Sequence, residues 1–441
     1  MFFRRTASRA IAVLGVTALA GLALSGCTAS GTTSSSGDAS QITFLAGGND
    51  PISIKTANGL AAGFMKKYPK INVKIDTRPA GTDGDNIIKT KLSTGTMEDV
   101  FFYNSGSLFQ ALHPERTMQP LTDEPWVSTL TKDFRQTVSV GKVLYGAPFG
   151  STFDGGVMYN KKVYEKLGLS VPDTWADFIS NSQKIKAAGG ITPVLGSYGD
   201  TWTAQLFVLA DFANVSAQDP KWAANYTANK AKYVDPPALA GFQDTAEVQS
   251  LGLMNKDYAS LTNVNALKLL ATGAAAQYPM ITVVIGNLAQ SNPDNVNDIG
   301  YFANPTANGN SHATVWEAGG AYIPKTTTGG KLSAAKKLIA FLNSSAGCDI
   351  QIAAAAPAGP YATTNCKVPS NAPALIADEQ KYQDAGKTGL ALEFISPVKG
   401  PNLSQITVQV GSGISTAAQG AELYDQDVKK QAQQLNLPGW N

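Results

Sequence analysis

Two kinds of apolar pattern alternate along the chain. Short runs of strand length, at 41–46, 71–75 and 100–103, are separated by longer segments in which apolar residues recur at helical spacing. The run at 71–75 alternates apolar and polar residues, whereas 100–103 is continuously apolar and suits a buried parallel strand. This succession of strands and helices predicts α/β layers around largely parallel sheets.

The predicted helices carry local start and stop signals. Asp50 precedes Pro51, where it can cap a helix that ends before Pro69. Further helices are predicted over 161–167 behind Asn160 and a short strand at 157–159, over 175–188 behind the capping box of Thr174 and Asp177, and over 334–343 behind Ser333.

Polar residues follow two of the predicted strands at their carboxyl ends. Asn49 and Asp50 come after the first strand, and Asn104 and Ser105 come after the third. In open α/β sheets, ligands bind outside the carboxyl ends of the strands. We therefore expect these four residues to contact a ligand, with helix capping as the alternative role of Asp50.

The start of the chain has the pattern of an export signal. Two arginines at positions 4 and 5 precede an apolar run over 10–24, which is shorter than the roughly 20 residues that span a bilayer as a helix. The run closes with Leu-Ser-Gly-Cys at 24–27, which resembles a bacterial lipobox. A plain secretory signal is the alternative.

This pattern predicts the fate of the first forty residues. Residues 1–26 are expected to be a lipoprotein signal peptide, and Cys27 is expected to carry the lipid anchor. Residues 27–40 have no bulky apolar side chain and are rich in Ser, Thr and Gly, so they predict a flexible tether. The folded body would then lie on the extracytoplasmic face of the bacterial cell membrane.

The composition is that of an ordinary globular protein, with 43% hydrophobic and 15% charged residues. The roughly 400 residues after the tether are too many for one core and suit two domains. Removal of a signal peptide with three arginines would take the 35 basic side chains to 32, against 33 acidic ones. A body this close to neutral gives no electrostatic reason to expect nucleic acid as a partner.

Two cysteines remain after the predicted signal peptide, at positions 348 and 366. In an oxidising compartment Cys348 and Cys366 are expected to form one disulfide. Closing a loop of this length would stabilise the fold by roughly 3 kcal/mol on the chain-entropy model. Two free buried thiols are the alternative.

Four neighbouring segments carry a resemblance to a known family. Their sequences are LYGAPF at 144–149, MYNKK at 158–162, LGL at 167–169 and VPDTWADF at 171–178. In order and spacing they resemble the extracellular solute-binding proteins of ABC importers, in the carbohydrate-uptake group that includes maltose-binding protein. Later segments at 273–276, 299–305, 319–325 and 334–342 continue the resemblance.

The resemblance implies an α/β, two-lobed clamshell of the periplasmic-binding-protein type (type II), with discontinuous lobes and a hinge. The N-terminal lobe would comprise 41–152 and 318–358, and the C-terminal lobe 153–317 and 359–441. The chain would cross between the lobes near 150–154, 316–320 and 359–362, where small residues suit a hinge. A monomer is expected, with a small-molecule ligand, ABC permease subunits as partners, and no cofactor or metal.

One departure from the family pattern affects the ligand. Many sugar binders of this group carry a stacking Trp shortly after the Gly-x-x-Ala-Ala segment, but Tyr278 and the residues that follow it stand there. The resemblance therefore does not extend to this stacking residue.

A neutral sugar needs flat apolar surfaces for its C–H groups and planar polar groups for its hydroxyls. Trp202 and Trp316 are the first candidates for stacking, with an ordinary core position as the alternative for each. The remaining candidate ligand contacts, at or beside the predicted crossings and strand tips, are Phe149, Asp154, Tyr278, Glu317, Gly319 and Gly320.

Other functions have less support in the sequence. A secreted carbohydrate-active hydrolase is the leading alternative, because it too would combine aromatics with paired carboxylates. An adhesive lipoprotein would not need polar strand tips around a hinge. No Gly-x-Ser-x-Gly motif occurs, and the two histidines, His113 and His312, lack the spacing of a zinc site. The sequence therefore predicts a non-enzymatic substrate-binding lipoprotein that captures a sugar or oligosaccharide.

Overall fold

The computed structural model describes residues 39–48, 50–79 and 81–441, and its strands form two large sheets. The first sheet has the order β2 (Asn72–Asp76), β1 (Gln41–Leu45), β3 (Val100–Tyr103), β12 (Gly319–Tyr322) and β6 (Gly146–Phe149). The second has the order β13 (Thr388–Leu390), β11 (Ala313–Trp316), β7 (Phe153–Asn160), β9 (Ala275–Ile281) and β8 (Thr192–Val194), with β10 (Ile299–Phe302) also paired to β7. A small ribbon pairs β4 (Ser139–Val140) with β5 (Val143–Leu144).

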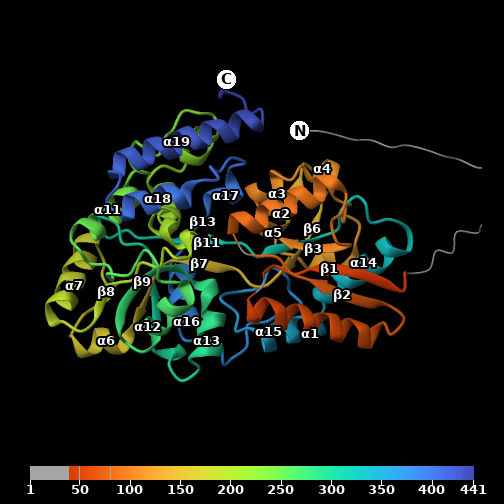
Figure 1. The fold of residues 1–441 in the computed structure, drawn as a ribbon, viewed down its shortest axis with the longest axis horizontal. Helices are drawn as coiled ribbons and strands as arrows, with labels where there is room; N and C mark the ends of the chain where they lie inside the picture. The colour runs from red at the N-terminus through yellow and green to blue at the C-terminus, as the bar shows by residue number, and fades with distance from the viewer. Residues whose placement is uncertain (1–38, 49, 80) are drawn as a thin grey trace, which may run out of the picture. The chain divides into compact units, whose positions relative to one another are not determined.

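Helices cover both large sheets (Figure 1). One side of the first sheet is covered by α1 (Pro51–Lys67) and α15 (Ser345–Ala354), and the other by α2 (Gly81–Thr94) and α3 (Ser107–Gln110). The helices α5 (Lys132–Thr137) and α14 (Gly329–Leu342) also pack around this sheet. A larger set of helices lies on and around the second sheet: α6 (Lys161–Lys166), α7 (Trp175–Ala188), α8 (Leu206–Ala210), α11 (Ala240–Ser250), α12 (Asn263–Ala271), α13 (Ile285–Ser291), α16 (Leu375–Asp384), α17 (Leu392–Ile395), α18 (Leu403–Gly411) and α19 (Ala417–Gln434). We call the first sheet with its helices the N-terminal lobe and the second the C-terminal lobe.

The sheets are mixed, which corrects the expectation of largely parallel pairing. In the first sheet β1 pairs in parallel with β2 and β3, but β12 is antiparallel to both of its neighbours. In the second sheet the long strand β7 is antiparallel to β9, β10 and β11. The reason is topological, because β7 and β12 enter directly from the other lobe rather than through a crossover helix.

Several local signals gave the correct helix ends. The carboxylate of Asp50 accepts the backbone N–H groups of Ile52 and Ser53 at 3.0 Å, at the start of α1. Thr174 and Asp177 form the predicted capping box of α7, which ends at Ala188. These helices begin and end where short-range hydrogen bonding favours it.

Two predicted boundaries were wrong. Helix α14 begins after Thr328 rather than after Ser333, because Leu332 packs against the N-terminal core and its burial extends the helix. The strand predicted at 157–159 is the eight-residue β7, since pairing with three neighbouring strands orders its whole length. Tertiary contacts lengthened both elements beyond their local signals.

The chain passes between the lobes after β6, after β11 and again in the segment 355–374. The last passage runs beside the first, where Thr152 N donates to Pro360 O at 2.8 Å and Ala358 N donates to Ser151 Oγ at 3.0 Å. The segment does not keep to one lobe. Ala362 belongs to the N-terminal core, while Leu375 belongs to a core of the C-terminal lobe.

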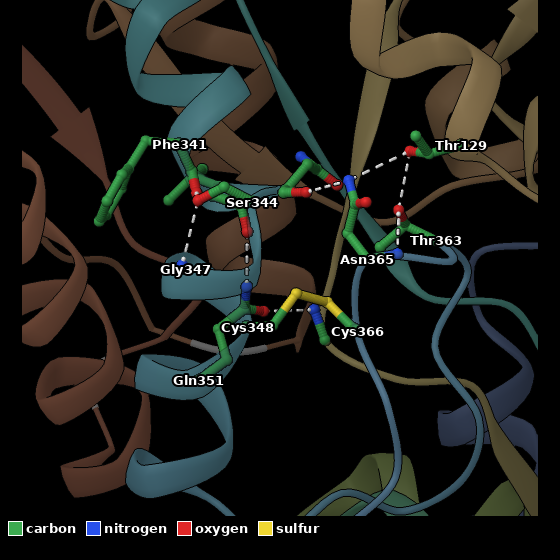
Figure 2. The surroundings of a disulfide bond; sticks show 12 residues. Thr129, Phe341, Ser344, Gly347, Cys348, Gln351, Thr363, Asn365 and Cys366 are labelled. Atoms are coloured by element: carbon green, nitrogen blue, oxygen red, sulfur yellow. Dashed lines mark hydrogen bonds between the residues drawn. A yellow bond between two sulfur atoms is a disulfide. The ribbon is translucent and has the colours of Figure 1, made fainter.

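A disulfide explains why this segment returns to the N-terminal lobe. Cys366 is bonded to Cys348 of α15, as the sequence predicted, with 5.3 Å between their Cα atoms. Neighbouring side chains reinforce the attachment, because Asn365 donates to Asn343 O at 2.9 Å. Figure 2 shows the pairing of Thr363 with Thr129 beside the disulfide. Residues 362–366 are therefore held on the N-terminal lobe, although the predicted boundary placed them in the other.

The predicted export segment, including Cys27, lies outside the described residues. Within the part of the chain that the structure describes, no helix combines the length and the apolar character needed to cross a bilayer.

Candidate functional site

Two adjoining cavities lie between the lobes. The larger has a volume of about 540 Å³ and the smaller about 300 Å³. Asn104 on the N-terminal lobe and Trp202, Gln205 and Lys399 on the C-terminal lobe line both cavities, so they form one cleft. These volumes fall within the range of small-molecule sites.

The cleft brings together half of the residues singled out in the sequence. Asn104 and Ser105 follow β3, whose carboxyl end faces the cleft as the sheet rule predicted. The second passage between the lobes contributes Trp316, Glu317 and Gly319 to the cleft. The sixth is Trp202, in the short 3₁₀ helix η2 (Thr201–Gln205).

Tyr278 is placed elsewhere, which corrects its predicted ligand contact. Only 1% of the residue is exposed, and its hydroxyl pairs with Ser197 Oγ at 2.5 Å and accepts from Asn263 Nδ2 at 2.9 Å. Its position on β9 directs the side chain into the core of the C-terminal lobe. It lines neither cavity of the cleft.

Asp154 also turns away from the cleft. Its backbone N–H donates to Thr282 Oγ1 at 2.9 Å, and its carboxyl is buried near Glu379 of α16. Burial raises the pKa of both carboxyls, and their mutual repulsion raises that of Glu379 further. Asp154 is therefore a buried acid of the C-terminal lobe and lines neither cavity.

Three other candidates line neither cavity. Phe149 packs against Phe44 and Phe102, with ring centroids 6.2 Å and 4.9 Å away. Gly320 is buried under the ring of Tyr322, where a Cβ would come within 2.2 Å of the Tyr322 hydroxyl. Asp50 uses its carboxylate to cap α1. Asn49 lies outside the described residues.

The two cleft tryptophans differ in setting. Trp202 is partly exposed and lines both cavities. Trp316 is only 6% exposed, and its ring stacks on that of Phe153 at 6.0 Å with an angle of 4° between the planes. A side chain at Gly155 would meet the Trp316 ring, because a Cβ there would lie 2.4 Å from it. Trp316 is thus largely a core residue whose remaining surface borders the smaller cavity.

The charged side chains of the cleft include more acids than bases. Its acids are Asp83, Asp85, Asp200, Glu317 and Glu393, and its bases are Lys89 and Lys399.

Several of these charges already have partners. Lys399 Nζ lies 2.5 Å from Glu393 Oε2, and Asp200 accepts the backbone N–H of Asn263 at 2.7 Å. Burial raises the pKa of Asp85, while the guanidinium of Arg78 opposes that rise.

Glu317 differs from the other acids. The residue is 7% exposed, and its buried Oε2 has no hydrogen-bond partner among the described residues. Burial, with a smaller contribution from Asp133, raises the pKa of Glu317 to about 7. A buried polar atom without a partner is costly, so a ligand hydroxyl that reaches Oε2 would restore a hydrogen bond.

Sequence reasoning missed much of the C-terminal side of the cleft. Gln205, Phe394 and Lys399 line it, but they lie in segments with no motif. On the N-terminal side, Asp85 and Lys89 belong to the first turns of α2. Their pattern is the same as that of a solvated helix face, so no signal in the sequence distinguishes them.

In the described part of the chain, no group of three or more His, Cys, Asp or Glu residues is arranged to hold a metal ion.

Comparison with known proteins identifies the family of the chain. Residues 48–347 match the family described as bacterial extracellular solute-binding protein. The multiple sugar-binding protein of Streptococcus mutans is 28% identical over 149 residues, which cover 34% of each chain. The melibiose/raffinose/stachyose-binding protein MelE of Bacillus subtilis is 28% identical over 142 residues, or 31% of this chain and 32% of MelE. The matched segments thus span about a third of these two relatives.

The fold is shared more widely than the sequence. A chitin oligosaccharide binding protein superposes with a TM-score of 0.79 at 19% identity, over 90% of this chain and all of the other. This likeness confirms the predicted two-lobed α/β clamshell. Since the family match covers well over half of the sequence, the chain belongs to the bacterial extracellular solute-binding proteins.

Proposed function

We propose that this protein is the substrate-binding component of an ABC importer and that it captures a sugar or oligosaccharide between its lobes. The observation that carries the proposal is that Trp202, Asn104 and Gln205 line both cavities of the cleft. An indole ring suits the C–H surface of a sugar, and planar amides suit its hydroxyls.

The relatives favour the same class of ligand. Their names describe binding of multiple sugars in one case and of melibiose, raffinose and stachyose in the other. The two cavities together have room for more than one sugar ring. We therefore propose an oligosaccharide as the preferred solute.

A solute that contacts both lobes explains how binding could change the form of the protein that the permease meets. Asn104 belongs to the N-terminal lobe and Gln205 to the C-terminal lobe, so a ligand that bonds to both stabilises the closed arrangement. The solute shifts the protein from the open to the closed form only to the extent that it binds the closed form more tightly. The closed form would then be the one that the permease subunits bind.

The pairing of the acidic side chains in the smaller cavity favours a binding protein over a hydrolase. A glycosidase needs two carboxyl groups flanking the bond to be cleaved. In the smaller cavity Glu393 is paired with Lys399, which leaves Glu317 without a free carboxylate partner there. We propose that the solute leaves the cleft chemically unchanged.

A thermal-shift screen tests the proposal. The purified protein is heated with a panel of sugars, oligosaccharides, polyols and sugar phosphates, and a ligand at 100 times its Kd should add about 2.7 kcal/mol of stability. A selective hit that is recovered intact supports sugar capture. Hydrolysis of the hit would instead support the hydrolase, and no shift across the panel would refute a carbohydrate ligand.

We also propose that Cys27 anchors the protein as a lipidated monomer on the outer face of the cell membrane. Replacing Cys27 with Ala should release the protein from the membrane fraction, and gel filtration of the released protein should give the mass of one chain. Retention in the membrane fraction would contradict the anchor.

A further inference from the structure

We propose that capture of the solute releases a proton from Glu317, so that the protein holds its solute more tightly above neutral pH than below it. This inference rests on the proposed function and concerns the regulation of the same cleft.

Glu317 lies at the wall of the proposed solute site. Glu317 joins β11 to β12 at the second passage between the lobes, and it lines the smaller cavity together with Trp316 and Gly319. The residue is 93% buried, since its exposed fraction is 7%. Its Oε2 is without a hydrogen-bond partner among the described residues. Glu317 therefore places a buried carboxyl oxygen that lacks a partner among these residues at the wall of the smaller cavity.

Within the described part of the chain, no cation compensates the charge of this carboxyl. The negative charge of Asp133, on α5 of the N-terminal lobe, disfavours its ionised form. The other ionisable groups that line the smaller cavity are Glu393 and Lys399, which pair with each other at 2.5 Å. Desolvation and the acid nearby together raise the pKa of Glu317 to about 7. Without ligand, the carboxyl therefore carries its proton for about half of the time at neutral pH.

A bound polyol would change this balance. Sugar hydroxyls that donate to Glu317 form shorter and stronger hydrogen bonds with a carboxylate than with a neutral acid. They therefore favour the ionised form and lower its pKa in the complex. Below pH 7 the solute must first displace a proton, whereas above pH 7 it does not. Affinity should accordingly rise with pH and level off above the pKa of the free protein.

The size of the effect follows from linkage. If the pKa of Glu317 falls from about 7 to its ordinary value of 4.5 in the complex, the Kd at pH 6 should be about tenfold larger than at pH 8. At pH 7 about 0.5 proton should leave for each solute bound.

Calorimetry measures this proton directly. The sugar identified by the thermal screen is titrated into the whole protein at pH 7 in phosphate and in Tris, whose ionisation enthalpies differ strongly. The difference in observed heat should correspond to about 0.5 proton released to the buffer. Repeating the titration between pH 6 and pH 8 should give the tenfold change in Kd.

Two variants assign the proton to its residue. Glu317→Gln keeps the shape of the side chain but cannot ionise, so its heat should be the same in both buffers and its Kd should not change with pH. Asp154→Asn is the matched control, because Asp154 is also a buried acid at a passage between the lobes but lines neither cavity. It should retain the full pH dependence.

The outcomes distinguish failure of the proton release from failure of the proposed sugar-binding function. Equal heats in the two buffers for the unmodified protein would overturn the inference, as would a pH dependence that survives in Glu317→Gln. If that variant does not fold, the buffer comparison on the unmodified protein still decides. A sugar that binds equally at pH 6 and pH 8 overturns only the proton release. Failure of every sugar to bind at any pH overturns the sugar-binding function as well.

Discussion

At the scale of single residues, burial distinguishes side chains that look alike in the sequence. Trp202 and Trp316 are both candidates for stacking on a sugar, yet Trp202 lines both cavities while Trp316 is largely covered by Phe153 and Gly155. Nothing within a few residues of either tryptophan reveals this difference. It depends on which strand or loop from elsewhere in the chain packs against each ring.

Trp202→Ala should weaken sugar binding by about 1–3 kcal/mol and leave the melting temperature nearly unchanged, because a partly exposed ring contributes little to the core. Isothermal titration with the sugar and a thermal melt of the free protein measure the two effects. Trp316→Ala is the control and should lower the melting temperature, since it removes the stacking on Phe153. Unchanged affinity in Trp202→Ala would remove that residue from the site.

Tyr278→Phe tests the corrected position of Tyr278. Its hydroxyl holds Ser197 and Asn263 inside the C-terminal lobe, so its loss should cost about 1–2 kcal/mol of unfolding free energy. Chemical denaturation gives that value. Sugar affinity should be unchanged, and a weaker affinity at equal stability would return Tyr278 to the list of ligand contacts.

At the scale of elements, the passages between the lobes connect local structure to motion. The segment 355–374 contacts the first passage through backbone hydrogen bonds at Thr152 and is fixed to the N-terminal lobe by the disulfide at Cys366. Any closing motion must therefore take place with residues 362–366 attached to that lobe. Nothing in the local sequence indicates the side on which these residues are held.

Replacing both Cys348 and Cys366 with Ser should lower the free energy of unfolding by about 3 kcal/mol, because the bond closes a loop with a sequence separation of 18. Urea denaturation measures the loss. Unmodified protein treated with a reductant should show the same loss, and the double variant should not respond to reductant. Equal stability with and without the bond would argue that the two thiols are free in the native protein.

At the scale of the whole molecule, buried acids make stability depend on pH. Burial raises the pKa of Asp211 and of Glu317 to about 7 each, and burial together with neighbouring acids raises that of Asp244. Each of these groups binds its proton more tightly in the folded state than in the unfolded state. For Asp211 and Glu317 the contribution to stability is therefore complete below the unfolded pKa near 4 and is lost as pH rises toward 7.

The free energy of unfolding should consequently fall as pH rises from about 5 to 7, by about 1.4 kcal/mol per pH unit for each such group. Urea denaturation across this range measures the slope. Asp211→Asn should reduce the slope, because an amide keeps the contact with Asn214 but does not titrate. A stability that is constant or increases between pH 5 and 7 would contradict the assignment of these acids as protonated in the fold.

The sequence by itself determined the local structure and the class of the protein. Helix caps at Asp50 and Thr174, the buried strand 100–103 and the family segments are encoded within short stretches, because capping and strand burial depend on neighbours a few residues away. The two lobes and the place of Asn104 at a strand tip followed from them.

Only the tertiary structure decided which side chains meet in the cleft. Lys399 and Asn104 lie far apart in the chain, yet they line the same two cavities from opposite lobes. The same packing buries Tyr278, extends α14 and leaves Glu317 without a partner among the described residues. Burial and pairing are sums over contacts from distant segments, and no local pattern in the sequence records them.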